Sequence, residues 1–196
     1  IQDKLEFDDF VINVGLRFEH FNPHAQYVSD LFDPFVDLNN PDPQLTGLSD
    51  ATSKNTLLPR VGVSFPITER GIIHFSYGHF TQMPSLRSMY TNPEWEFPVG
   101  GTLYGNPNLK PEKTVAYEMG LQQQLTETIA FDISGFYKDI RDYLATQTIR
   151  FSTIAGQDIY SIRLNRDYAN VKGVTFALTK RRSRNGIDRK STRLNS

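Results

Sequence analysis

The sequence contains no cysteine among its 196 residues, and its 22 acidic and 21 basic residues nearly cancel, for a formal net charge of −1. The absence of cysteine excludes disulfide bonds and thiolate metal sites. The charge balance offers no electrostatic attraction to nucleic acid, so nucleic acid is not an expected partner. Neither property identifies a cellular compartment.

Long apolar runs are also missing, and no stretch approaches the roughly 18 consecutive apolar residues expected of a transmembrane helix. A membrane protein built from strands stays open, because a barrel strand needs only about ten residues of alternating character. The first residues, Ile1 to Phe7, have no Met, no basic region and no apolar core, so they do not resemble a signal peptide. We expect the chain to be a fragment.

What the sequence does contain is strict apolar–polar alternation. In the segment from Phe10 to Glu19, every second residue is apolar and the residues between them are mostly polar or Gly. This period of two is typical of a β-strand with one apolar face. Similar segments indicate about seven strands, at residues 5–7, 10–19, 61–67, 73–78, 115–123, 129–138 and 174–179. The fold class predicted from this pattern is all-β.

The connections between these strands alternate in length. Tight turns at Asp8-Asp9, 68–71 and 126–128 alternate with long polar loops at 22–56, 81–113 and 141–165, the last with a possible small hairpin of its own. Transmembrane β-barrels sort their connections in this way, with short periplasmic turns and long extracellular loops. A soluble sandwich or propeller also has alternating strands, but has no reason to sort its loops by end. The sequence therefore predicts a sector of about seven antiparallel strands from a large transmembrane β-barrel.

Several segments resemble the TonB-dependent outer-membrane receptor family, in its C-terminal barrel domain. The most specific is GNPNLKPEKTVAYEMGL, Gly105 to Leu121, where a Pro-rich loop leads into an alternating strand. Six further segments follow the order of the family: IQDKLEF, GLRFEHF, LPRVGVSFPIT, HFSYGHF, FYKDIRDY and NRDYANVKGVTFALTKR. The resemblance covers nearly all of residues 1–188. The last residues, RKSTRLNS at 189–196, are expected to be a non-native or disordered tail.

The resemblance implies a function in the outer membrane of a Gram-negative bacterium. The family's barrel, of about 22 strands, takes up a bulky nutrient such as a siderophore, glycan, peptide or cobalamin. The expected partners are outer-membrane lipid, the nutrient ligand, the protein's own plug domain, and TonB, which contacts the missing N-terminal region and supplies energy. No cofactor and no enzymatic activity are implied. Two alternatives remain: a soluble all-β binding module, and an outer-membrane barrel hydrolase, although no GxSxG motif is present.

Two sets of strand residues follow from the alternation. Apolar residues expected to face lipid are Val14, Leu16, Val63, Phe75, Met119, Phe131 and Phe176, with Tyr77, Tyr117, Tyr137 and Phe18 suited to the interfacial girdles. Polar residues expected to face the lumen are Arg17, Glu19, Arg60, His74, Glu118, Asp132 and Lys138. The lumen residues are interpreted as plug contacts or a substrate path, with a merely solvated wall as the alternative.

The loops hold the candidate ligand-contact residues Tyr90, Trp95, Phe97 and Tyr104. Aromatic rings provide binding area at a low entropy cost, but they can equally pack a long loop against its neighbours. Calcium is a weaker hypothesis for the acidic loop, through Asp33, Asp37 and Asp42, because no EF-hand spacing is present. The four histidines show no zinc-binding spacing, so no metal site is predicted.

Overall fold

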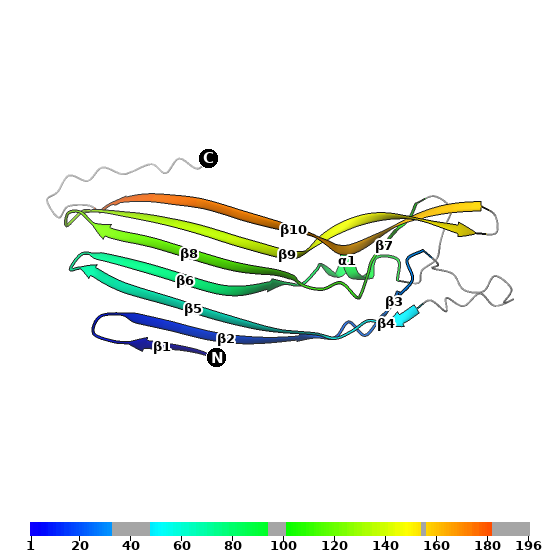
Figure 1. The fold of residues 1–196 in the computed structure, drawn as a ribbon, viewed down its shortest axis with the longest axis horizontal. Coiled ribbons are helices and arrows are strands. Elements are labelled where there is room, and N and C mark those ends of the chain that lie inside the picture. The colour runs from blue at the N-terminus through cyan, green and yellow to red at the C-terminus, as the bar shows by residue number, and fades with distance from the viewer. Residues whose placement is uncertain (33–47, 94–100, 154–155, 182–196) are drawn as a thin grey trace.

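The computed structural model of the chain describes residues 1–32, 48–93, 101–153 and 156–181 (Figure 1). Its elements, in chain order, are β1 (Gln2–Glu6), β2 (Val11–Phe21), β3 (Gln26–Val28), β4 (Leu48–Asp50), β5 (Lys54–Thr68), β6 (Gly71–Gln82), α1 (Leu86–Tyr90), β7 (Leu103–Tyr104), β8 (Glu112–Gln124), β9 (Ile129–Thr153) and β10 (Gly156–Lys180). Among the described residues, no helix is long and apolar enough to span a membrane.

One large sheet dominates the structure, with the strand order β1-β2-β5-β6-β8-β9-β10-β7. Its first seven strands are antiparallel neighbours, as the alternation predicted. The eighth, β7, is a two-residue strand that pairs parallel with β10 through Leu103–Ser161 and Tyr104–Ile162. Strands β3 and β4 form a separate two-stranded sheet. The large sheet does not close on itself, so the chain forms a sector of a barrel wall.

The connections are sorted by end, as expected from their lengths. The tight turns β1–β2, β5–β6 and β8–β9 lie at one end of the sheet, called here the turn end (Figure 1). The β1–β2 turn is closed by the Phe7 N–H, which donates to the Phe10 carbonyl at 2.9 Å. The opposite end, called here the loop end, holds β3, β4, α1 and β7. The fold class predicted from the sequence is therefore confirmed.

The prediction of a loop at 141–165 is wrong, because β9 and β10 continue through it. The two strands are each 25 residues long and stay paired from Lys180–Ile129 to Gly156–Thr153. Two irregularities interrupt them: Asp142 has φ of 60°, and the register shifts on both sides of Asp167. Apolar alternation is weak here because this part of the hairpin lies beyond the apolar band of the sheet, and only the short stretches around Ile149 and Tyr160 meet apolar partners. The sequence suggested a possible small hairpin in this segment. The structure shows there the outer half of the long β9–β10 hairpin.

The long loops also contain more structure than their composition suggested. The 22–56 loop carries β3 and β4, and the 81–113 loop carries α1 and β7. Ser85 caps α1, since its side chain accepts a hydrogen bond from the Ser88 N–H at 3.2 Å. These short elements lie at the loop end, where Val28 of β3 and Tyr104 of β7 pack against the outer half of the β9–β10 hairpin (Figure 1).

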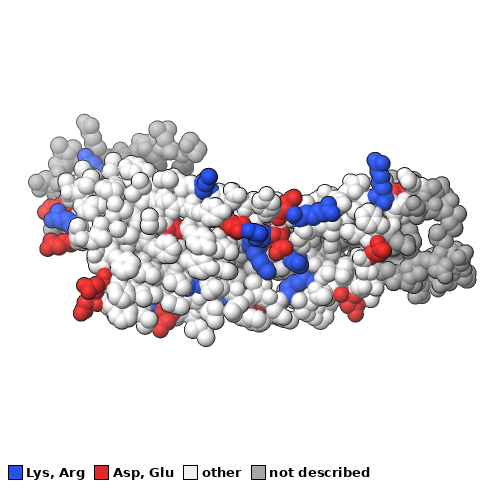
Figure 2. Space-filling model, in the orientation of Figure 1, with Lys and Arg blue, Asp and Glu red and all other residues white. Residues whose placement is uncertain are grey.

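The two faces of the large sheet differ in polarity. Directly paired residues share a face, and successive pairs show that the seven predicted lipid-facing residues all lie on one of them. Large apolar side chains stay exposed there, including Met119 at 63%, Phe176 at 65% and Val174 at 74%. Figure 2 shows a broad uncharged area between the charged turn end and a group of charges near the middle of the sheet. Exposed apolar surface on this scale marks an interaction surface.

The buried core lies at the loop end of the molecule. Tyr104, Ile149, Tyr160 and Ile162 are at most 1% exposed and cluster with Val28 and Phe151. The ring of Tyr160 packs edge-on against those of Tyr104 and Phe151, with centroid distances of 5.9 and 5.7 Å. This loop core joins β3, β7 and the outer half of the β9–β10 hairpin into one unit.

Candidate functional site

The seven polar residues predicted to face a lumen all lie on the face opposite the apolar one. Arg60 pairs with Gly15 and Gly78, and the same row continues through Ala116 to Lys138. Glu118 lies one row nearer the turn end, while His74 and Asp132 lie nearer still. The structure thus brings together, on one face, side chains that the sequence distributes over five strands.

A hollow of about 1020 Å³ lies over this polar face. Small residues form part of its floor, because Gly15, Gly78 and Ala116 lie in the row of Arg60 and Lys138, and Gly62 lies in the row of Glu118. Small residues leave the longer charged side chains free to extend above the sheet. The hollow is therefore an open depression in the wall, lined by charged side chains and by apolar ones such as Phe80 and Phe136.

The charges around the hollow are only partly paired. Arg17 forms an ion pair with Glu19 at 2.7 Å, and Glu19 also accepts a hydrogen bond from the Thr81 hydroxyl at 2.7 Å. Two other cations lie against rings: the guanidinium of Arg60 is 4.4 Å from the Phe80 centroid, and the Lys138 ammonium is 5.4 Å from that of Phe136.

Within the described part of the chain, Glu118, Asp132 and Lys138 form no ion pair. Unpaired charges are costly in lipid and tolerable in contact with water or a polar partner. The charge pattern therefore suits contact with water or with a polar partner better than contact with lipid.

The loop-end segment Gly105–Pro111 is almost entirely buried and acts as a clasp between strands. Asn106, 7% exposed, donates from Nδ2 to the Arg163 carbonyl at 3.1 Å, and its Oδ1 accepts from the Asn108 N–H at 2.9 Å. The Gly105 N–H donates to the Thr91 carbonyl at 2.8 Å. A Cβ on Gly105 would lie 2.6 Å from the Met89 carbonyl, so only glycine fits against α1.

The same clasp reaches β5 through Asn108. Its Oδ1 accepts hydrogen bonds from the Thr52 N–H at 3.1 Å, the Thr52 hydroxyl at 2.9 Å and the Lys54 ammonium at 2.6 Å. Partial burial lowers the pKa of Lys54, and the nearby charge of Lys110 lowers it further. The ammonium is held by oxygens that compensate for its lost hydration.

Two tyrosine hydroxyls attach the β2–β5 connection to the other loops. Tyr160 donates to the Leu31 carbonyl at 2.7 Å, and Tyr90 donates to the Pro23 carbonyl at 2.9 Å. Burial raises the pKa of Tyr160, and the charge of Asp30 raises it further. The phenol therefore stays neutral, as its donor role requires.

The four aromatic residues predicted to contact a ligand differ in their surroundings. Tyr104 has no exposed surface and lies in the loop core, which is the packing role that the sequence left open as an alternative. Tyr90 is half-buried beside Pro23. Trp95 and Phe97 lie outside the described residues, as do Asp33, Asp37 and Asp42 of the calcium hypothesis. Among the residues that are described, no group of three or more acidic or His side chains could hold a metal ion.

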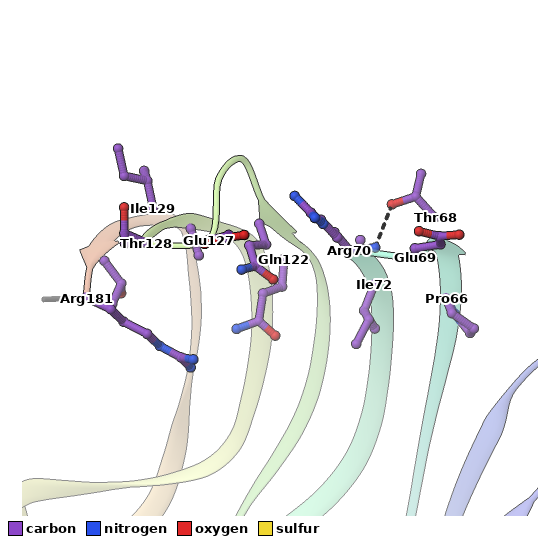
Figure 3. A pocket seen from close by; sticks show the side chains of 14 residues that line it. Pro66, Thr68, Glu69, Arg70, Ile72, Gln122, Glu127, Thr128, Ile129 and Arg181 are labelled. Atoms are coloured by element: carbon purple, nitrogen blue, oxygen red, sulfur yellow. Dashed lines mark hydrogen bonds between the residues drawn. The ribbon is translucent and has the colours of Figure 1, made fainter. Parts of the chain in front are cut away.

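A smaller hollow of about 490 Å³ lies at the turn end of the polar face. It is bordered by the β5–β6 and β8–β9 turns and by the end of β10 (Figure 3). The side chains of Arg181 and Gln122 extend into the same space, and the Arg70 N–H closes the first turn on the Thr68 hydroxyl at 3.3 Å. Its lining mixes polar side chains with apolar ones such as Pro66, Ile72 and Ile129.

Sequence reasoning missed the clasp, although it singled out the segment that forms it. The signal was present in three asparagines, Asn106, Asn108 and Asn165, set among prolines and bulges. Asn side chains replace backbone partners in irregular segments, since each offers a donor and an acceptor. Which distant carbonyl each one reaches depends on the fold and not on local spacing.

The family model for the TonB dependent receptor-like β-barrel matches residues 1–194. The chain belongs to this family. A curated relative, the iron-regulated outer membrane virulence protein of Vibrio cholerae serotype O1, is 35% identical over 60 residues. That match covers 30% of this chain and 9% of the relative, so the chain corresponds to a small part of a longer protein.

Solved structures show the same fold in other receptors. The ferric enterobactin receptor PfeA of Pseudomonas aeruginosa superposes with a TM-score of 0.63 at 18% identity, over 90% of this chain and 23% of that one. The hemophore receptor HasR of Serratia marcescens, in complex with its hemophore HasA and heme, gives a TM-score of 0.56 at 16% identity, over 89% and 30%. The FrpB iron transporter of Neisseria meningitidis gives 0.54 at 18% identity, over 92% and 22%.

Family membership places the chain in the outer membrane of a Gram-negative bacterium. The exposed apolar face is then the lipid-facing wall, which excludes the soluble binding module considered from the sequence. The loop end corresponds to the extracellular side and the turn end to the periplasmic side.

Proposed function

We propose that the full-length protein is an active transporter that takes up a bulky nutrient through the outer membrane with energy supplied through TonB. The observation that carries the proposal is the pairing of two features in one wall: an outer face with a broad band of exposed apolar side chains, and an inner face with a hollow and unpaired charges. Family membership supports it, because the matched relatives are receptors and transporters.

The ligand is proposed to belong to the siderophore, glycan, peptide or cobalamin classes. Within that range the names of the relatives favour an iron-bearing ligand: one is iron-regulated, one is an iron transporter, and two are receptors for a hemophore and for ferric enterobactin. Ferric chelates are therefore the first ligands to test. Trp95 and Phe97 are the proposed aromatic contacts to the ligand, since the side chain of Tyr104 is buried in the loop core.

The polar face is proposed to line the barrel lumen. Arg17, Arg60, Glu118 and Lys138 surround the larger hollow, where they would contact the plug domain or the passing ligand. The plug and the segment that contacts TonB would belong to parts of the protein outside this chain. Charged side chains on the lumen wall then find partners on the plug that the isolated wall does not provide.

We also propose that the protein is not an enzyme. The outer-membrane hydrolase considered from the sequence would need a nucleophile with a positioned base. The relatives named above are receptors and transporters.

Uptake by cells tests the proposal directly. A deletion strain grown under iron limitation, complemented with the full-length gene, should recover uptake of a radiolabelled ferric chelate, and recovery should disappear when TonB is deleted or a protonophore is added. Trp95→Ala should lower uptake, while Tyr168→Ala, an exposed residue outside the loop core, should leave it unchanged. Binding without energy-dependent uptake of any chelate, glycan, peptide or cobalamin would contradict active transport.

A further inference from the structure

A row of tyrosines crosses the apolar face. Tyr77, Tyr117 and Tyr137 lie directly opposite one another on β6, β8 and β9, with ring centroids 5.1 and 6.4 Å apart. The hydroxyl of Tyr77 hydrogen-bonds to Nε2 of His79, one row nearer the loop end. Amphipathic rings gather where the apolar interior of a bilayer meets the head groups. The row therefore marks the extracellular boundary of the membrane on this wall.

The charge of the apolar face changes at this row. Between the row and the turn end, β8, β9 and β10 carry only uncharged residues on this face until Lys180: Met119, Leu121, Gln123, Phe131, Ile133, Gly135, Val174, Phe176 and Leu178. From the row toward the loop end, three cations lie on the same face: Lys172, opposite Tyr137, and Lys113 and Arg141, which are opposite each other.

One acid accompanies the three cations. Asp139 holds Arg141 through both carboxylate oxygens, with an Nη2–Oδ2 distance of 2.9 Å. Lys113 and Lys172 are both exposed, and the described part of the chain gives neither of them an ion pair. The cluster therefore keeps an excess of positive charge on the face that contacts lipid.

The spacing of the cluster suits the head-group layer. Lys113 lies four positions before Tyr117, which is about 13 Å along a strand, and its side chain is long enough to bend back toward the boundary. Lys172 lies on the tyrosine row itself. Ammonium groups, a guanidinium and phenol hydroxyls together match the oxygens of phosphate groups.

We propose that Lys113, Lys172 and Arg141 form a binding site for the phosphate groups of outer-leaflet lipid, whose phosphorylated form in the Gram-negative outer membrane is lipid A. The lipid's acyl chains would lie along the apolar face below the tyrosine row, and its phosphates would lie against the three cations. Lipid is the occupant because this face is directed away from the lumen, at the level where head groups replace acyl chains.

The test uses the full-length receptor in detergent, with bound lipid A counted by native mass spectrometry. The double variant Lys113→Gln/Lys172→Gln should bind lipid A more weakly, by about fivefold per lysine, corresponding to about 1 kcal/mol for each charge near a lipid surface. Arg141 is left in place, because its removal would leave Asp139 without its partner. The heat-dependent shift of the folded barrel on gels confirms that each variant is folded.

The matched control is Lys180→Gln, on the same strand and the same face but at the turn end. It should leave lipid A binding unchanged, and lipid A stripped of its phosphates should bind wild type and the double variant equally. Equal losses in the control and the double variant, or no loss in either, would overturn the site. Full displacement of lipid A by millimolar inorganic phosphate would show a site for a free anion instead and would also overturn it.

Discussion

Asn165 and Lys110 exchange two hydrogen bonds although 55 residues separate them in the sequence. The Lys110 N–H donates to Asn165 Oδ1 at 2.8 Å, and Asn165 Nδ2 donates back to the Lys110 carbonyl at 3.0 Å. The same Nδ2 also donates to the Asp142 carbonyl at 2.7 Å. One amide side chain thus joins the clasp, the bulged part of β10 and the irregular residue of β9.

Replacing Asn165 by Ala should loosen the clasp. The substitution leaves a backbone N–H and two carbonyls without their partner, which costs about 1–3 kcal/mol for each buried group that water cannot reach. Hydrogen exchange in the full-length protein should show faster exchange at Lys110 and in residues 105–111. Asn170→Ala, an exposed position on the same strand, is the control. Equal protection in the two variants would show that the clasp does not depend on Asn165.

Phe176→Arg should destabilise the barrel in the membrane. Phe176 is 65% exposed on the apolar face and lies midway between Lys172 and Lys180, so it occupies the centre of the apolar band. An Arg at the bilayer midplane costs about 2–4 kcal/mol. The loss would be measured as a lower free energy of unfolding of the full-length protein in lipid vesicles.

The neighbouring position supplies the control for that substitution. Thr175→Arg places the same charge on the polar face, because Thr175 pairs with Ser134. Its free energy of unfolding should stay close to that of wild type. If Thr175→Arg were the more damaging of the two, the assignment of faces would be reversed.

Cysteines at Tyr117 and Glu118 should react differently with a water-soluble maleimide. This chain has no cysteine of its own, so each substitution introduces one new thiol in this region. Glu118 lies on the hollow face beside Ser76 and Phe136, and Tyr117 lies in the tyrosine row. We expect labelling at Glu118→Cys and little at Tyr117→Cys in intact membranes. The opposite result would show that the predicted lumen face contacts lipid.

The loop end should lose stability in alkali through Tyr160. Its pKa in the folded protein is raised by burial, whereas an unfolded tyrosine titrates near 10. Below about pH 10 the phenol is neutral in both states and the stability is fully present. As the pH rises above that value, the unfolded state loses its proton first, so stability falls.

Tyr160→Phe removes this dependence together with the hydrogen bond to Leu31. At pH 8 the variant should be less stable by about 1 kcal/mol, and by pH 11 the difference from wild type should shrink. The heat-dependent mobility of the full-length barrel on gels, measured at both pH values, checks this. A difference that stays constant from pH 8 to pH 11 would exclude Tyr160 as the titrating group.

The alternation in the sequence was enough to predict the strands that cross the membrane and which residues share a face. Arg60, Glu118 and Lys138 lie on one side of the sheet because strand geometry has a period of two, and hydrogen-bonded neighbours keep that period in register. Whether these side chains meet a plug or a ligand is still a prediction, because their partners lie outside this chain.

The outer half of the β9–β10 hairpin could not be predicted from alternation in the sequence. This part of the hairpin lies beyond the lipid, so most of its positions have no apolar solvent to select a face, and Thr146, Thr148 and Arg150 gave no strand signal. The apolar residues that do alternate, Ile149 and Phe151, pack against loops from distant parts of the sequence. Their partners could not be inferred locally.

By itself the sequence determined the fold class, the two faces of the wall and the sorting of its connections, because these follow from local periodicity and loop length. Only the tertiary structure decided the role of the segment from Gly105 to Pro111. Its asparagines bond to Thr52, Lys54 and Arg163, groups more than 50 positions away. Hydrogen bonds between irregular segments depend on where the whole sheet places each carbonyl, and no local pattern encodes that position.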